Sequence, residues 1–424
     1  MEFLGDPAHN AEVQDLSPPD EIPAPQKTAI VVGAGPAGLM AAEVLAAAGA
    51  AVTVLERMPS PARKLLMAGR GGLNLTHTEP HAAFLARYGA ARPWLEPAIA
   101  AFSPEALRAW CDGLGIETFV GSSGRIFPKA MKASPLLRAW LRRLDSQGVK
   151  LLTRHSFVGW AEDGALRVET PEGERLFRPD VSVLALGGAS WPRLGADGSW
   201  VEAFGGVPIA PLLPANCGFI VPWSPVFRAK FAGTPLKRIA LQFGNTVVRG
   251  EAMISESGIE GGAVYALSAQ LRAAILADGP TRLRVDLRPD LTLAQLAERL
   301  AVPRRGQSLG NFLRKAAGLD PLQVGLVQEA LHDGASPDDL AALIKSVRIR
   351  ITAPMGLERA ISTAGGVMQN GVNGRFMLRA HPGSFVAGEM LDWEAPTGGY
   401  LLQACLATGR AAAEGAALWL KRHT

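Results

Sequence analysis

The stretch from Ala29 to Glu56, AIVVGAGPAGLMAAEVLAAAGAAVTVLE, constrains the fold more than any other part of the chain. It begins with a short apolar run, passes through a glycine-rich turn and continues as a segment rich in Ala and Leu. Gly49 ends that segment, and a second apolar run leads to Glu56. Apolar runs of this length favour strands, and the Ala/Leu segment favours a helix. The sequence therefore predicts a strand–helix–strand unit of the dinucleotide-binding type.

The turn of this unit, Gly33-Ala34-Gly35-Pro36-Ala37-Gly38, has the spacing GxGxxG. The first glycine permits the sharp turn, the second lets a pyrophosphate approach the backbone, and the third lets the helix pack closely on the strand. The unpaired amides that begin the helix favour an anion. Glu56 can accept hydrogen bonds from a ribose and would repel a 2′-phosphate, which favours FAD or NAD(H) over NADP(H). A glycine turn without a ligand is the alternative.

Length and composition limit the remaining choices. A chain of 424 residues, 48% of them hydrophobic, is long enough for two or three structural units. The formal charge is +4 and the Lys and Arg residues are scattered, so nucleic-acid binding is allowed but not indicated. Cys111, Cys217 and Cys405 stand far apart, which indicates a reducing compartment and neither a zinc site nor a redox dithiol.

Residues 1–26 contain acidic residues and prolines without an apolar period. This composition predicts a disordered extension and not a signal peptide. No stretch is long and apolar enough to span a bilayer. We therefore expect a cytoplasmic protein with no membrane partner and no metal.

A second glycine-rich loop, RKLLMAGRGGLNLTH, runs from Arg63 to His77. Its glycines allow the backbone to lie against a ligand, and its Arg, Lys and Asn side chains offer donors. We expect it to wrap the pyrophosphate and ribityl chain of a flavin cofactor; a flexible surface loop is the alternative. In the helical region that follows, Ser103 and Ser134 each precede a proline and are predicted to begin a helix.

The changing pattern along the chain predicts an interrupted α/β fold. Residues 27–190 and 354–424 form the dinucleotide-binding domain, which includes a buried strand that ends at Gly187-Gly188. Residues 191–285 hold short apolar runs among Pro and Gly, as in a small β-barrel or sandwich, and residues 286–353 contain four helical segments. Near the end of the chain, Thr397-Gly398-Gly399-Tyr400 precedes a long helix whose free amides could face the flavin.

The chain resembles the HI0933-like flavoprotein family over nearly everything after residue 26. The resemblance rests on the GxGxxG turn, the loop from Arg63 to His77, LALGGASWPRLGADG at 184–198, and the two final blocks ISTAGGV and VAGEMLDWEAPTGGYLLQACLATG. It implies FAD as cofactor and a Rossmann-like FAD-binding domain interrupted by a β-barrel-like domain and a small helical domain.

Two departures mark an atypical branch of that family. The glycine loop often ends in Arg-Cys-Asn, but here it reads Gly72-Leu73-Asn74, so the cysteine is absent. The inserted domain often carries Thr-His before Gly-x-Ser-Gly-Pro, but here residues 255–262 read SESGIEGG. A histidine acid or base is therefore not carried over to this chain.

We expect an FAD-dependent oxidoreductase that transfers a hydride between flavin and a small organic substrate, with NAD(P)H as a possible electron donor. Glu256 and Tyr400 are the acid/base candidates. Arg70, Arg193 and Lys230 could steer an anionic substrate, although surface charge is the alternative for each. An RNA-modifying or RNA-associated flavoprotein and a flavin-binding sensor without turnover are the alternative functions.

The predicted cofactor-binding residues come from the fingerprint, the glycine loop, the paired glycines and the final blocks. They are Gly33, Gly35, Pro36, Ala37, Gly38, Glu56, Arg57, Lys64, Gly69, Gly71, Gly72, Asn74, Leu75, Gly187, Gly188, Gly388, Glu389, Asp392, Thr397, Gly398, Gly399 and Tyr400.

Overall fold

The predicted strand–helix–strand unit lies at the centre of a five-stranded parallel sheet. The computed structural model describes residues 26–423, so the predicted extension at residues 1–26 lies outside them except for Gln26. The unit consists of β1 (Thr28–Val32), α1 (Pro36–Ala47) and β2 (Ala51–Glu56). The strand order is β20-β10-β1-β2-β6, and each neighbouring pair is parallel. The other three strands are β6 (Lys150–Thr153), β10 (Val181–Leu184) and β20 (Ser384–Val386).

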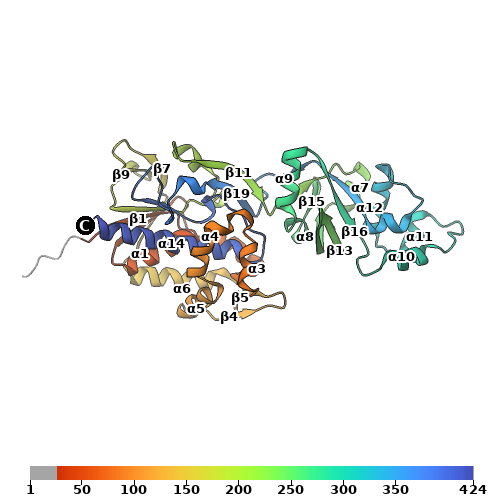
Figure 1. Ribbon diagram of the computed structural model, residues 1–424, viewed down its shortest axis with the longest axis horizontal. Helices are drawn as coiled ribbons and strands as arrows, with labels where there is room; N and C mark the ends of the chain where they lie inside the picture. The colour runs from red at the N-terminus through yellow and green to blue at the C-terminus, as the bar shows by residue number, and fades with distance from the viewer. Residues whose placement is uncertain (1–25, 424) are drawn as a thin grey trace, which may run out of the picture.

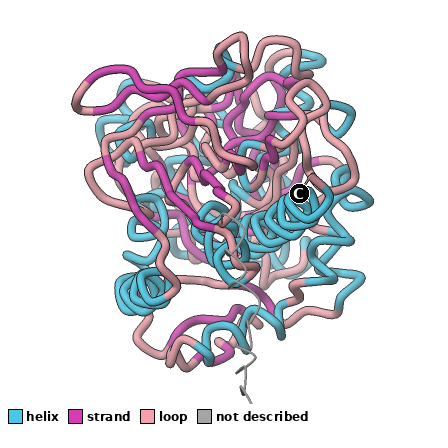
Figure 2. Tube along the Cα trace, turned by 90° about the vertical axis from the view of Figure 1, so that its left-hand side faces the viewer, coloured by secondary structure: helices cyan, strands magenta, loops and turns pink. Residues whose placement is uncertain are grey.

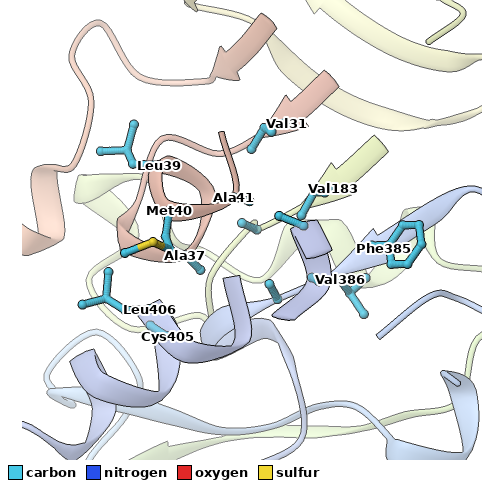
Figure 3. Close-up of a cluster of buried hydrophobic side chains, with 14 of the residues drawn as sticks. Val31, Ala37, Leu39, Met40, Ala41, Val183, Phe385, Val386, Cys405 and Leu406 are labelled. Carbon is cyan, nitrogen blue, oxygen red and sulfur yellow. The ribbon is translucent and has the colours of Figure 1, made fainter. Parts of the chain in front are cut away.

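The C-terminal helix α14 (Tyr400–Arg422) packs alongside α1 against this sheet (Figure 1). Figure 2 shows the same lobe from the side, with the C-terminal end of α14 toward the viewer. The two backbones come so close that a Cβ on Gly409 would lie 2.3 Å from the carbonyl oxygen of Ala37. Figure 3 shows Met40 of α1 and Leu406 of α14 in the apolar cluster between these helices and the strands. The end of the chain therefore completes the domain that its beginning starts.

Short helices and two antiparallel three-stranded sheets, β3-β5-β4 and β7-β8-β9, complete this part of the molecule. Ser103 caps α5 as predicted, since its Oγ accepts a hydrogen bond from the amide of Ala106 at 3.3 Å. The prediction for Ser134 is wrong, because α6 begins at Ala133 and Lys132 occupies its N-cap. The bounds are α2 (Arg63–Ala68), β3 (Thr76–His77), α3 (His81–Ala86), α4 (Arg92–Ala101), α5 (Pro104–Gly113), β4 (Thr118–Val120), β5 (Arg125–Pro128), α6 (Ala133–Ser146), β7 (Ser156–Trp160), β8 (Leu166–Thr170) and β9 (Gly173–Phe177).

The middle of the chain forms a second lobe (right side of Figure 1) around a seven-stranded sheet. Its strand order is β17-β16-β13-β14-β15-β12-β18, so the two outermost strands are separated in the chain only by Thr352. A sheet whose two edges continue into each other must curl, and this supports the predicted barrel-like unit. The strands are β12 (Phe219–Ile220), β13 (Pro235–Phe243), β14 (Thr246–Ile254), β15 (Gly258–Glu260), β16 (Thr281–Asp286), β17 (Val347–Ile351) and β18 (Ala353–Pro354).

Seven helices among the described residues accompany this sheet. The predicted helical segments appear as four of them, α10 to α13. Their apolar faces pack into the same core as the strands, because residues such as Phe312 and Leu326 belong to one cluster with Leu283 and Ile349. The bounds are α7 (Pro225–Phe231), α8 (Gly262–Tyr265), α9 (Ser268–Asp278), α10 (Leu293–Leu300), α11 (Leu309–Ala316), α12 (Pro321–His332) and α13 (Leu340–Lys345).

Two hydrophobic cores divide the described residues. The first contains Trp200, Phe204 and Val367, and the second runs from Cys217 to Ala360. We call residues 26–215 with 361–423 the first lobe, and residues 216–360 the second lobe. The antiparallel pair of β11 (Ile209–Ala215) and β19 (Ser362–Val367) carries the chain into and out of the second lobe. The domain division stays a prediction, and the cores favour boundaries near residues 216 and 361 over boundaries at 191, 286 and 354.

No helix within residues 26–423 has the length and apolar character needed to cross a membrane.

Candidate functional site

A cavity of about 730 Å³ lies at the carboxyl ends of the parallel strands. Its walls come from the residues that follow β1, β2, β10 and β20, from the glycine-rich loop, and from the segment before α14. Open parallel sheets bind dinucleotides in this place, because strand ends and helix amino ends meet there. The volume falls within the range of roughly 300–1,000 Å³ that is typical of ligand and cofactor sites.

Most of the predicted cofactor-binding residues line this cavity, and a smaller group does not. Lining residues are Gly33, Gly35, Pro36, Ala37, Glu56, Arg57, Lys64, Gly72, Asn74, Gly187, Gly388, Glu389, Thr397, Gly398 and Gly399. The predicted residues outside the lining are Gly38, Gly69, Gly71, Leu75, Gly188, Asp392 and Tyr400.

The three glycines of the fingerprint have different physical roles. Gly33 has φ +99°, and a Cβ there would lie 2.3 Å from the carbonyl oxygen of Ala185. A Cβ on Gly38 would lie 1.8 Å from the carbonyl oxygen of Gly33, so this residue sets the contact between helix and turn. A Cβ on Gly35 would meet no atom of the described residues within 4 Å, and its φ of −82° suits any residue. Packing within the fold therefore does not require glycine at 35, whereas a pyrophosphate lying over the turn would.

Glu56 is held by two backbone amides at the end of β2. Its Oε2 accepts from the amide of Ala34 at 2.9 Å, and its Oε1 accepts from the amide of Met58 at 2.8 Å. Each carboxylate oxygen can accept more than one hydrogen bond, so both can still accept from ribose hydroxyls. The carboxylate is thus fixed in position at the cavity wall.

Two cations of the cavity wall are paired within the protein. Arg57 contacts Asp197 at 2.7 Å, and Lys64 contacts Glu389 at 2.7 Å. The side chain of Glu389 is only 7% exposed, and its other oxygen accepts from the amide of Thr363 at 3.0 Å. Lys64 also donates to Ser190 Oγ at 2.9 Å. This network ties α2 to the segments after β10 and β20, so it fixes the shape of the cavity.

Two buried polar atoms at the cavity have no partner within residues 26–423. They are Nε of Arg63, a donor, and Oδ1 of Asn74, an acceptor. Buried polar atoms without partners are uncommon and call for an explanation such as a bound ligand. FAD carries both the phosphate acceptors and the N–H donor that these atoms lack, so the residues present fit this cofactor. Arg63 is not among the predicted cofactor-binding residues, although it opens the loop that follows the ribose acid.

The predicted acid/base residues do not reach the cavity. Glu256 is exposed in the turn between β14 and β15 and lies outside the lining. Tyr400 Oη donates to Glu79 at 2.6 Å, and its ring stacks on that of His77, away from the cavity. Burial and the neighbouring Glu79 raise the pKa of Tyr400, while hydrogen bonds from Arg87 help to lower the pKa of Glu79. Both tyrosine and carboxylate therefore serve to anchor the start of α14.

The three residues considered for substrate steering are separated by the fold. Arg70 lines the cavity, and its side chain forms no hydrogen bond or ion pair with any described residue. Arg193 is exposed outside the lining, and Lys230 lies over the ring of Phe231 in the second lobe. Only Arg70 of the three is therefore placed to meet a ligand of the cavity.

A second cavity, of about 510 Å³, lies between the two lobes. It shares Asn216 and Pro396 with the first cavity, so the two adjoin at the point where the chain enters the second lobe. Asp392 lines this second cavity and not the first, and burial raises its pKa. Tyr265, from α8 of the second lobe, lines it as well, and burial raises the pKa of its phenol. The sequence carried no motif that marked Tyr265.

Two further side-chain chemistries bear on these cavities, metal coordination and thiol nucleophilicity. Within the described part of the chain, no group of three or more His, Cys, Asp or Glu residues is arranged to hold a metal ion. Cys405 lines the first cavity, but burial raises its pKa, as burial also raises the pKa of Cys217 to about 11. These thiols stay protonated at neutral pH and are poor nucleophiles.

Comparison with known proteins extends these observations. The chain is 26% identical over 407 residues to the 3-dehydro-bile acid delta(4,6)-reductase of Clostridium scindens, covering 91% of this chain and 98% of that protein. It is 26% identical over 404 residues to the ribosomal RNA dihydrouridine synthase of Escherichia coli, covering 88% and 94%. The 3-ketosteroid delta1-dehydrogenase of Sterolibacterium denitrificans superposes with a TM-score of 0.51 at 13% identity, covering 93% and 100%, which shows a shared fold.

The model of one protein family matches residues 27–415, from the first strand of the parallel sheet into α14. That family is described as the HI0933-like protein Rossmann domain. The resemblance seen in the sequence motifs is confirmed: the chain belongs to the HI0933-like family of FAD-dependent oxidoreductases.

Proposed function

We propose that this protein uses FAD to reduce a carbon–carbon double bond conjugated to a carbonyl group in a small organic substrate. The observation that carries this proposal is the pair of adjoining cavities, one of which fits FAD while the other opens beside it between the lobes. The names of the two relatives support the reaction type. The delta-4 and delta-6 double bonds of a 3-dehydro-bile acid and the ring double bond of uridine are all conjugated to a carbonyl group.

The residues of the first cavity would hold the cofactor, which supplies the hydride when bound. Glu56 would accept from the ribose, and the amides that begin α1 together with Arg63 would bind the pyrophosphate. Gly398 and Gly399, with φ of +136° and +93°, shape the turn before α14, whose first amides would stabilise negative charge on the ring. The pair of Lys64 and Glu389 would keep these walls in register.

Tyr265 is our candidate proton donor in place of Glu256 and Tyr400. Its side chain lines the cavity between the lobes, and the phenol is protonated at neutral pH, as a general acid requires. The hydride would add to the alkene carbon remote from the carbonyl, and the phenol proton to the carbon next to it. Replacing Tyr265 with Phe should lower turnover by roughly 10²- to 10⁴-fold and leave the flavin spectrum unchanged. Unchanged turnover would remove Tyr265 from the mechanism.

The electron donor is tested by the visible spectrum of the FAD-loaded protein under anaerobic conditions. NADH or NADPH should bleach the oxidised-flavin band, and cyclohex-2-enone should restore it while saturated cyclohexanone should not. Restoration by neither ketone would contradict the proposed acceptor class. A band that persists with both nucleotides would exclude NAD(P)H as donor, and chemical reduction with dithionite would then allow the acceptor test to proceed.

A uridine within RNA is the second candidate substrate. It has the same conjugated double bond, and the relative from Escherichia coli is named for its product. An RNA oligonucleotide that contains uridine should then restore the oxidised-flavin band of the reduced protein. An oligonucleotide in which dihydrouridine replaces uridine should not.

A further inference from the structure

One face of the second lobe carries four arginines in a two-by-two array. Strands β16 and β17 read TRLRVD and VRIRI, so arginine and apolar residues alternate in both. The apolar residues Leu283, Val285 and Ile349 are at most 4% exposed and face the core. The arginines between them therefore point to the opposite face, where all are exposed: Arg282, Arg284, Arg348 and Arg350. We call these four residues the arginine ladder.

The register of the two strands places like charges directly opposite each other. The strands are antiparallel, with Arg282 opposite Arg350 and Arg284 opposite Arg348. Residues that face each other across such a pair have Cα atoms roughly 4.5–5.5 Å apart. Within residues 26–423, no hydrogen bond or ion pair reaches any of the four side chains. Like charges in this position are destabilising, so the folded protein alone gives no reason for the array.

We propose that the arginine ladder binds the phosphate backbone of RNA. Guanidinium groups bind phosphate oxygens in a bidentate manner, and a nucleic-acid strand presents a closely spaced row of phosphates. An array at two-residue spacing on two adjacent strands matches a repeating anion better than it matches one carboxylate. None of the four arginines lines either cavity, so this surface is separate from the cofactor site.

Other polyanionic partners fit the ladder less well. Peripheral membrane surfaces combine basic residues with exposed apolar anchors, but the apolar residues between these arginines are buried. Protein interfaces have a core from which charged residues are depleted, and the ladder offers only charge. Phosphate binding by the ladder does not depend on the proposed function. Only the choice of RNA rests on that function, since an RNA that carries a uridine substrate would have to be held by its backbone.

The test is fluorescence anisotropy with the FAD-loaded, full-length protein and a fluorescein-labelled single-stranded RNA of mixed sequence, without an electron donor. Replacement of all four ladder arginines with Gln should weaken binding at least tenfold. It should also reduce the slope of log affinity against log salt by roughly 0.7 for each phosphate that the variant no longer binds. The melting temperature should not fall, because like-charge repulsion is removed.

The matched control removes the same charge from four arginines with side chains 41–61% exposed that already have carboxylate partners. Gln at these positions should leave the affinity within twofold: Arg92, Arg167, Arg178 and Arg410. Equal RNA affinity of the ladder variant and the unaltered protein would overturn the proposal. So would binding to vesicles of anionic lipid or to polyglutamate in the absence of RNA binding. The binding test measures no turnover, so its outcome is independent of the reaction. If the protein binds RNA through the ladder but reduces none of the tested double bonds, the proposed function is refuted and the RNA-binding proposal stands.

Discussion

Cations in the two lobes differ in what surrounds them. In the first lobe, Arg57 and Lys64 line the cavity, and each contacts a carboxylate at 2.7 Å. In the second lobe, the arginine ladder has no carboxylate partner within the described residues. Cations that are paired within the fold can fix the shape of a site, as Arg57 and Lys64 do, whereas unpaired cations are free to meet a ligand directly. The cavity holds both kinds, since Arg63 Nε and Arg70 have no partner there within residues 26–423, but the ladder holds only the second kind.

The largest expected effect is on FAD affinity, at the glycine turn over which the pyrophosphate would lie. Replacing Gly35 with Val should lower FAD affinity at least 100-fold, about 2.7 kcal/mol, because the side chain would occupy the space of the pyrophosphate. The fold itself offers no clash at this position. Gly205→Val is the matched control, since a Cβ there also meets nothing within 4 Å. Titration of the apoproteins with FAD measures both affinities, and tight binding by Gly35→Val would contradict the cavity assignment.

Removal of one partner from the buried ion pair of Lys64 and Glu389 should lower the stability of the protein. Glu389→Ala leaves the Lys64 ammonium with only Ser190 Oγ as acceptor and the Thr363 amide with none, which should cost about 3 kcal/mol of unfolding free energy. Asp290→Ala removes the partner of Arg249, but both side chains are more than half exposed, so it should cost less than about 0.5 kcal/mol. Urea unfolding of the apoproteins compares the two. Equal losses would show that the buried pair has no special role.

Loss of the Arg63 Nε donor at the cavity wall should lower FAD affinity by a smaller factor. Arg63→Lys keeps the positive charge but removes Nε, the buried atom without a partner among the described residues. FAD affinity should fall about tenfold, as expected for one hydrogen bond to a charged group. Arg92→Lys, in a partly exposed ion pair with Glu96 away from the cavity, is the control and should bind FAD normally. Isothermal calorimetry measures both, and unchanged affinity for Arg63→Lys would indicate that its donor meets water instead of the cofactor.

The smallest expected effect is a change in stability, with opposite signs for two charge-reversal variants, one in each lobe. Arg284→Glu places a carboxylate opposite Arg348 and should stabilise the protein by about 0.5 kcal/mol. Arg167→Glu, in the first lobe, places a second carboxylate beside Glu174 and should destabilise the protein by a similar amount. Thermal unfolding measures both variants. A lower melting temperature for Arg284→Glu would show that the ladder is already compensated within the protein, and the contrast between the lobes would disappear.

Features set by neighbouring residues could be predicted from the sequence. The unit from Ala29 to Glu56 was predictable because its strand, turn, helix and second strand follow one another within one segment. Ser103 was predictable as a cap for the same reason, since it binds an amide three residues away. Ser134 shows the limit of this reasoning, because helix α6 begins one residue earlier and packs without that cap.

Features set by pairing between distant segments could not be predicted. The Lys and Arg residues look scattered in the chain, but the register of β16 and β17 gathers four of them on one face. The alternation of arginine with apolar residues in both strands was the signal that could have found them. Tyr265 reaches the cavity between the lobes only because the second lobe folds back toward Asp392 and Trp393. Glu256 was chosen from its place in a sequence block, and local sequence does not fix the direction of an exposed turn.

The chain crosses between the two lobes twice, at adjacent points, and this arrangement affects how the second lobe could be replaced. The chain leaves the first lobe after Ala215 and returns at Ile361, and Ala215 is paired with Ser362 across β11 and β19. Asn216 joins the crossings further, since its Nδ2 donates to Ser362 Oγ at 2.7 Å. The whole second lobe is thus a single cassette with adjacent ends. Its exchange for another segment would alter what reaches the flavin while the register of the parallel sheet stayed the same.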